Sequence, residues 1–136
     1  MTTTINASTS NGLVQTADGS GILKVQSNGV TTNALAWIRF AGAASPTVAS
    51  SYNVTSLTRN GAGDYTVNFT TALSDANYCA VPFTSAASNA VYGKFANIVG
   101  TTAGSTAPTT SAIRITSGYT SGTFDEAYMG VVVFGN

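Results

Sequence analysis

The acidic residues are the side chains with which this sequence could do acid–base chemistry. There are five of them: Asp18, Asp64, Asp75, Asp125 and Glu126. Glycoside hydrolysis needs two carboxyl groups that converge across a cleft. Asp18, Asp64 and Asp75 lie in turn-like segments, where an Asp side chain usually bonds to nearby backbone. Asp125 and Glu126 are adjacent, so in an extended segment they point to opposite faces. We therefore predict that the chain is not an enzyme.

Nucleophilic and metal-dependent chemistry also lacks its usual residues. The sequence has no histidine, which excludes Ser-His-Asp and Cys-His catalysis and the commonest zinc ligand. Its single cysteine, Cys79, stands among apolar residues, so we expect a small buried side chain and not a reactive thiolate. The Asp18–Gly21 turn lacks the further acidic ligands of a calcium loop and the Gly-Lys-Ser/Thr ending of a phosphate loop. We predict no metal and no cofactor.

The charge content points to an assembled protein. Only 7% of the 136 residues are charged, 43% are hydrophobic and the net charge is zero. Nucleic-acid binding needs clustered cations, and the five here are scattered. No apolar run approaches the ~18–20 residues of a membrane span, and the N-terminus does not resemble a signal peptide. The chain should therefore be made in a cytoplasm and bind neither nucleic acid nor membrane. So little charge leaves apolar surface for other copies to cover, and we expect a homo-oligomer, specifically a trimer.

The elements that must position these side chains are β-strands. In Tyr65–Phe69 every second side chain is apolar, which places Tyr65, Val67 and Phe69 on one face against a core. Tyr52–Arg59 precedes it across the Asn60–Asp64 turn, so the two runs form a hairpin. Further strands are expected at Leu13–Thr16, Ile22–Gln26, Ala34–Phe40, Ala76–Phe83, Val91–Val99, Ala112–Thr116 and Ala127–Phe134.

Details of these runs suggest where the strands lie. Val131–Phe134 is continuously apolar, as in a strand buried on both faces, so we expect a central strand or one buried in an oligomer interface. Pro82 indicates an edge strand or a bulge. Gly42–Ser51 and Gly100–Thr110 are small, polar and loop-like. The fold predicted for residues 34–136 is an all-β antiparallel sandwich, or a jelly-roll-like domain, with residues 1–33 as an N-terminal β-hairpin arm.

The arm has little apolar bulk and cannot bury itself. We expect it to add strands to a neighbouring sheet edge, with Leu13, Ile22, Leu23 and Val25 filling shallow pockets. Packing of the hairpin on its own β domain is the alternative.

Several segments resemble known phage proteins. Asn6–Gly12 and Thr16–Val30 resemble the N-terminal part of small virion structural proteins of tailed phages. A recurrent β domain of phage tail-fibre and virion-surface proteins is similar to five further segments: Ala36–Phe40, Tyr52–Ser56, Gly63–Phe69, Asp75–Tyr78 and Val131–Asn136.

This resemblance implies a structural role in a bacteriophage virion. One reading is a capsid decoration (cement) protein, which stabilises the shell from its outer surface and contacts the major capsid protein or another virion protein. The other is a tail-fibre or receptor-binding tip module that recognises a host surface glycan. In that case Tyr119, in a turn-rich segment, is the receptor-facing candidate. Hundreds of copies per virion would indicate cement, whereas tens would indicate a fibre.

Overall fold

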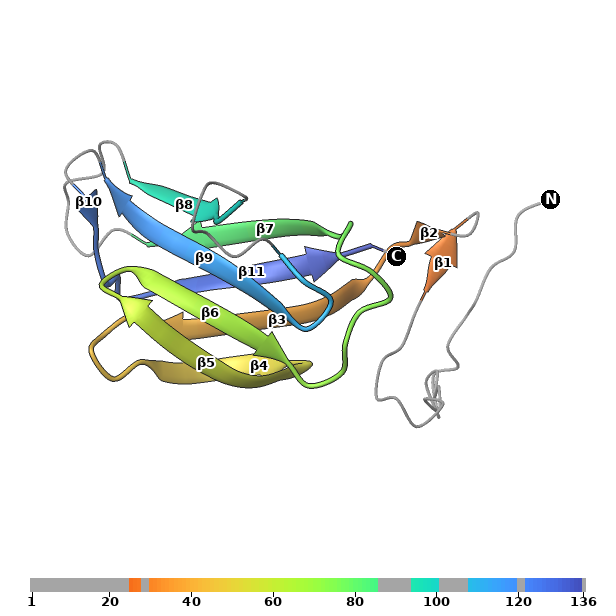
Figure 1. Ribbon diagram of the computed structural model, residues 1–136, viewed down its shortest axis with the longest axis horizontal. Helices are drawn as coiled ribbons and strands as arrows, with labels where there is room; N and C mark the ends of the chain where they lie inside the picture. The colour runs from red at the N-terminus through yellow and green to blue at the C-terminus, as the bar shows by residue number, and fades with distance from the viewer. Residues whose placement is uncertain (1–24, 28–29, 86–93, 101–107, 120–121, 136) are drawn as a thin grey trace, which may run out of the picture.

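Two antiparallel sheets pack face to face in the computed structural model, which describes residues 25–27, 30–85, 94–100, 108–119 and 122–135 (Figure 1). These residues include no helix. The predicted all-β sandwich is confirmed.

One sheet has four strands in the order β4-β3-β11-β7. They are β3 (Ala34–Ala41), β4 (Thr47–Tyr52), β7 (Cys79–Thr84) and β11 (Met129–Phe134). The central position of β11 is confirmed, as is the edge position of the strand that contains Pro82. However, β11 is not buried on both faces. Val131 and Val133 are buried but Val132 is partly exposed, because no other layer of the described chain covers the outer side of this sheet.

The other sheet has β10, β9, β6 and β5 in that order, and β8 also pairs with β9. These strands are β5 (Val54–Gly61), β6 (Asp64–Phe69), β8 (Phe95–Ile98), β9 (Ala112–Tyr119) and β10 (Gly122–Thr123). The predicted hairpin is confirmed, since β5 and β6 pair antiparallel with Leu57 opposite Val67.

The core lies between the sheets, and β6 contributes to it by alternation. Tyr65, Val67 and Phe69 of β6 all point into it, as predicted. The remaining buried apolar side chains come mainly from β3, β9 and β11: Leu35, Ala36, Ile38, Phe40, Leu73, Ile113, Ile115, Met129, Val131 and Val133.

A one-residue corner at Asn53 carries the chain from β4 in one sheet to β5 in the other. Its backbone is left-handed, with φ of 54°. The side-chain Nδ2 donates to the carbonyls of Leu35 and Thr71, each at 3.1 Å, and Oδ1 accepts from the Thr71 N–H at 2.8 Å. Asn tolerates left-handed backbone better than most residues, so this residue type suits both requirements.

Replacing this corner residue should destabilise the sandwich. We expect Asn53→Ala to lower the free energy of unfolding by about 2–4 kcal/mol, because it removes three hydrogen bonds and because alanine tolerates positive φ less well than asparagine. Asn53→Gly keeps the backbone permissive and should lose less. Urea unfolding measures both, with the exposed Asn77→Ala as control. A loss below about 1 kcal/mol for Asn53→Ala would contradict this role.

Strand β4 corrects one prediction. Gly42–Ser51 was expected to be a loop, but Thr47–Tyr52 pairs with β3 over most of its length. Ala and Ser give this segment weak strand propensity, and the ladder offered by β3 overrides it.

The described part of the N-terminal arm forms a short hairpin that begins where the predicted hairpin ends. Strand β1 (Gln26–Ser27) pairs with β2 (Val30–Thr31), with Gln26 opposite Thr31. The predicted strand Leu13–Thr16 and the Asp18–Gly21 turn lie outside the described residues, as does most of Ile22–Gln26. Val25 is tied to the chain beyond β2, since its carbonyl accepts from the Thr32 N–H at 2.7 Å and its N–H donates to Asn33 Oδ1 at 2.7 Å. Figure 1 places this short hairpin near the end of the sandwich where β11 finishes.

Candidate functional site

The outer face of the β5–β6–β9 sheet is polar. Thr58, Thr66 and Arg114 stand side by side across the three strands. The Asn68 amide donates to Ser56 Oγ at 3.0 Å and to Thr58 Oγ1 at 3.2 Å. Polar side chains that bond to one another across strands in this way are typical of a sheet face turned toward solvent.

The outer face of the four-stranded sheet is apolar instead. The strand register places Val132 opposite both Trp37 and Val81, and places Phe83 in the next row across Gly130. Val81 is 52% exposed and Phe83 38%. We call Trp37, Val81, Phe83, Tyr128 and Val132 the outer apolar face.

Arg39 is the one charged residue in the four strands of this sheet. Its guanidinium lies over the ring of Tyr128, 4.4 Å from the ring centroid, and Tyr128 is itself 51% exposed. A cation held on an aromatic face in this way remains compatible with an apolar surface.

Cys79 borders the outer apolar face and corrects another prediction. We expected it to be buried, but it is exposed. In the edge strand β7 the even-numbered side chains turn toward the core, which leaves Cys79, Val81 and Phe83 on the outside. A single strand read in isolation shows the alternation but not which side is covered.

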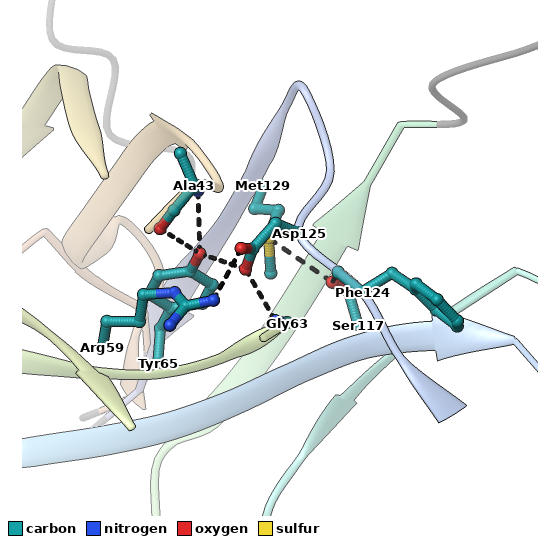
Figure 2. A network of polar contacts seen from close by, with 8 residues as sticks. All are labelled: Ala43, Arg59, Gly63, Tyr65, Ser117, Phe124, Asp125 and Met129. Carbon is teal, nitrogen blue, oxygen red and sulfur yellow. Dashed lines mark hydrogen bonds and ion pairs between the residues drawn. The ribbon is translucent and has the colours of Figure 1, made fainter. Parts of the chain in front are cut away.

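A polar cluster around Asp125 closes one end of the sandwich (Figure 2). The Asp125 carboxylate accepts from the Arg59 guanidinium at 2.8 Å, the Gly63 N–H at 2.7 Å and the Tyr65 hydroxyl at 2.5 Å. The Tyr65 hydroxyl oxygen accepts in turn from the Ala43 N–H at 3.0 Å. These contacts join β5, the β5–β6 turn, the start of β6 and the loop after β3 to the segment before β11.

The cluster keeps Asp125 ionised. Partial burial opposes ionisation, but the hydrogen bonds from Arg59, Gly63 and Tyr65 outweigh it and hold the pKa of Asp125 below its ordinary value. A general acid would need the opposite shift. The arrangement therefore suits a structural tie between the two sheets.

The other described carboxylates are also bonded. Asp64 pairs with Arg114 through two hydrogen bonds, at 2.8 and 2.5 Å, which lower the pKa of Asp64. We had expected Asp64 to bond the backbone of its own turn. Instead its carboxylate accepts from the Asn60 side chain of that turn at 3.1 Å and reaches across to Arg114 of β9. Glu126 is buried and forms an ion pair with Lys94, so it and Asp125 have different partners, as their adjacency predicts. Asp75 accepts from the Asn77 N–H at 2.6 Å, which confirms the turn reading.

Two tyrosines give the fold a predictable alkaline limit. Burial, and secondarily the hydrogen bond to Asp125, raises the pKa of Tyr65 to about 12, and burial alone raises that of Tyr78 to about 12. An unfolded tyrosine titrates near ~10. Between these two values the folded state holds more protons than the unfolded state. The stability that the two protonated tyrosines contribute is therefore complete below about pH 10 and is lost as the pH rises to about 12. Urea unfolding across this range should give a steadily falling free energy of unfolding, less steep in Tyr78→Phe. A flat profile would contradict the burial of these hydroxyls.

A stacked pair of exposed rings stands at the same end as the Asp125 cluster. Tyr119 and Phe124 are nearly parallel, at 13°, with ring centroids 4.6 Å apart, and are 36% and 37% exposed. Lys94 Nζ lies 5.4 Å from the Tyr119 ring centroid. The backbone beneath is fixed, because Phe124 N–H donates to the Ser117 carbonyl and Ser117 Oγ donates to the Phe124 carbonyl. Figure 2 shows the Phe124 ring pointing away from the cluster.

The residues predicted to act in binding fall in different places. Val25 is exposed beside the short hairpin, and Tyr119 is exposed beside Phe124. Leu13, Ile22 and Leu23 lie outside the described residues. The outer apolar face was missed, although Trp37 and Arg39, like Val81 and Phe83, already had the two-residue spacing that puts side chains on one face.

In the part of the chain that the structure describes, no three Cys, Asp or Glu side chains gather as a metal site would require. No helix there has the length and apolar character needed to cross a membrane. Comparison with protein-family models, curated proteins and solved structures finds no match to this chain.

Proposed function

We propose that this chain is a non-enzymatic structural protein of a bacteriophage virion, specifically a capsid decoration protein on the outer surface of the shell. The observation that carries the proposal is the contrast between the two outer faces of the sandwich. One is hydrogen-bonded and polar, whereas the other presents exposed Val81, Phe83 and Tyr128. A small domain with one apolar and one solvated face suits attachment to a larger assembly.

The resemblance to virion proteins supports the same role. The segments that carry it contribute to β3, β5, β6 and β11, the strands that form much of the core. In this role the arm anchors the domain on the major capsid protein or another virion protein. The side chains that fill pockets on that protein are Leu13, Ile22, Leu23 and Val25. The exposure of Val25 supports that part.

Stoichiometry tests the proposal. In purified particles of the phage that encodes the chain, quantitative mass spectrometry against the major capsid protein should find hundreds of copies per virion. Tens of copies would overturn the cement role and favour a fibre. Absence from the particles would overturn the virion role altogether.

The Tyr119–Phe124 pair favours a second candidate, a tail-fibre or receptor-binding tip that recognises a host surface glycan. Exposed aromatic rings on a fixed backbone offer flat apolar surface on which the C–H face of a sugar ring can stack. Under this alternative, Phe124→Ser abolishes binding of the purified protein to host cells while Phe83→Ser does not. Equal binding by both variants would exclude these rings as the receptor site.

A further inference from the structure

We propose that the outer apolar face is the surface through which one copy of this chain binds a second copy. The proposal deepens the proposed virion role by naming the surface of self-association. Its test uses the purified chain alone, so its failure is distinguishable from a failure of the stoichiometry test.

The composition of the face is that of an interface core. Trp, Tyr, Phe and Arg are enriched at protein–protein interfaces, whereas Lys, Glu and Asp are depleted. Trp37, Phe83, Tyr128 and Arg39 supply all four enriched types, and the four strands contain no Lys, Glu or Asp. The polar outer face of the other sheet has the opposite character.

Charge favours a copy of the chain over a charged partner. Arg59, Lys94 and Arg114 each form an ion pair within the molecule, away from the outer apolar face. Arg39 is stacked on Tyr128. A nucleic acid or an acidic peptide would find one cation there. A second copy would bring a surface with the same single cation, Arg39, already stacked on Tyr128, and would leave no carboxylate buried without a partner.

The edges of the four-stranded sheet make pairing through the face preferable to extension of the sheet. Ser85 N–H donates to the Tyr128 carbonyl at 2.8 Å. With the register of β7 and β11, the backbone N–H groups of the odd-numbered residues of β7 therefore point toward β11, within the sheet. The even-numbered positions face the free edge, and there Pro82 has no N–H to donate. On the other edge, the register of β4 shifts between Arg39 and Phe40, which marks a bulge. Bulges and edge prolines both discourage strand addition.

The size of the face predicts a reversible contact. Four strands about 4.8 Å apart and about 20 Å long give a flat footprint of about 400 Å² per copy. Two copies would bury about 800 Å² in total, below the ~1,200 Å² of a standard stable interface. Association should therefore depend on concentration in the micromolar range, and stable assembly would need contacts in addition to this face.

Sedimentation equilibrium of the purified full chain tests the proposal, from low micromolar to several hundred micromolar. Wild type should pass from monomer to dimer, because a face that pairs with the same face of a second copy closes at two copies. Val81→Asp puts a charge at the β7 end of the row Trp37–Val132–Val81, where the side chain is 52% exposed, and should lower the association constant at least tenfold. Thr58→Asp, on the polar outer face of the other sheet, should associate like wild type. A wild type that stays monomeric, or a folded Val81→Asp that associates like wild type, would overturn the proposal.

The single exposed cysteine provides a second test that needs no variant. Attachment of a polyethylene-glycol maleimide to Cys79, at the border of the face, should block association of wild-type protein. Unchanged association of the modified protein would count against the proposal, including in the case where Val81→Asp fails to fold.

Discussion

Val67→Asp should abolish folding. Val67 has no exposed surface and lies between Leu57 of β5 and Ile113 of β9 in the middle of the core. A carboxylate there would have no partner and no water, which costs several kcal/mol. Domains of this size are stable by only about 5–15 kcal/mol. The variant should lack the cooperative urea transition and the near-ultraviolet circular dichroism of the wild type.

The same substitution at Val81 is the matched control. Val81 belongs to the opposite sheet, but its side chain faces outward. Val81→Asp should keep the wild-type spectrum and unfold with a free energy within about 1 kcal/mol of it. If Val67→Asp unfolds like wild type, the assignment of the core face is wrong.

Gly63→Ala should be the most damaging conservative change in the β5–β6 turn. Gly63 has φ of +64°, and a Cβ there would come within 2.5 Å of both the Ser117 carbonyl oxygen and the Phe124 nitrogen. Both contacts are backbone and cannot move aside without breaking the bonds that Gly63 makes to Ser117 and Asp125. The expected loss is about 3–5 kcal/mol, from strain at positive φ and from the displaced strands.

Gly61, the last residue of β5, provides the control, since a Cβ added there meets no atom within 4 Å. Gly61→Ala should change the free energy of unfolding by less than about 1 kcal/mol and could stabilise the fold by restricting the unfolded chain. Urea unfolding of the two variants side by side measures the difference. Equal free energies of unfolding for Gly63→Ala and Gly61→Ala would show that the Phe124 backbone does not lie in close contact with Gly63.

Local patterns in the sequence were sufficient for the sandwich and its best hairpin. The alternation in Tyr65–Phe69 gave both the strand and its core face, because a period of two fixes which side chains share a side. Pro82 marked an edge strand because proline has no backbone N–H to donate to a neighbouring strand. The resemblance to virion proteins and the trimer remain predictions.

Tertiary pairing explains what the sequence could not reveal. Strand β4 has weak propensity and exists because β3 offers it a ladder. The ion pair between Asp64 and Arg114 joins residues 50 positions apart. The exposure of Cys79 depends on which side of β7 the other sheet covers, and no local pattern states this. For the same reason the outer apolar face emerged only when Trp37, Val132 and Val81 were placed side by side.

Trp37 emission offers the most direct test of the claim that this face is covered by another copy. It is the single tryptophan of the sequence, and it is partly exposed on the outer apolar face. As the protein is concentrated from low to several hundred micromolar, its emission should shift to shorter wavelength and its quenching by acrylamide should fall, because the indole leaves water. The shift should be absent in Val81→Asp. An emission maximum and quenching that stay constant across the whole range in wild type would contradict the account.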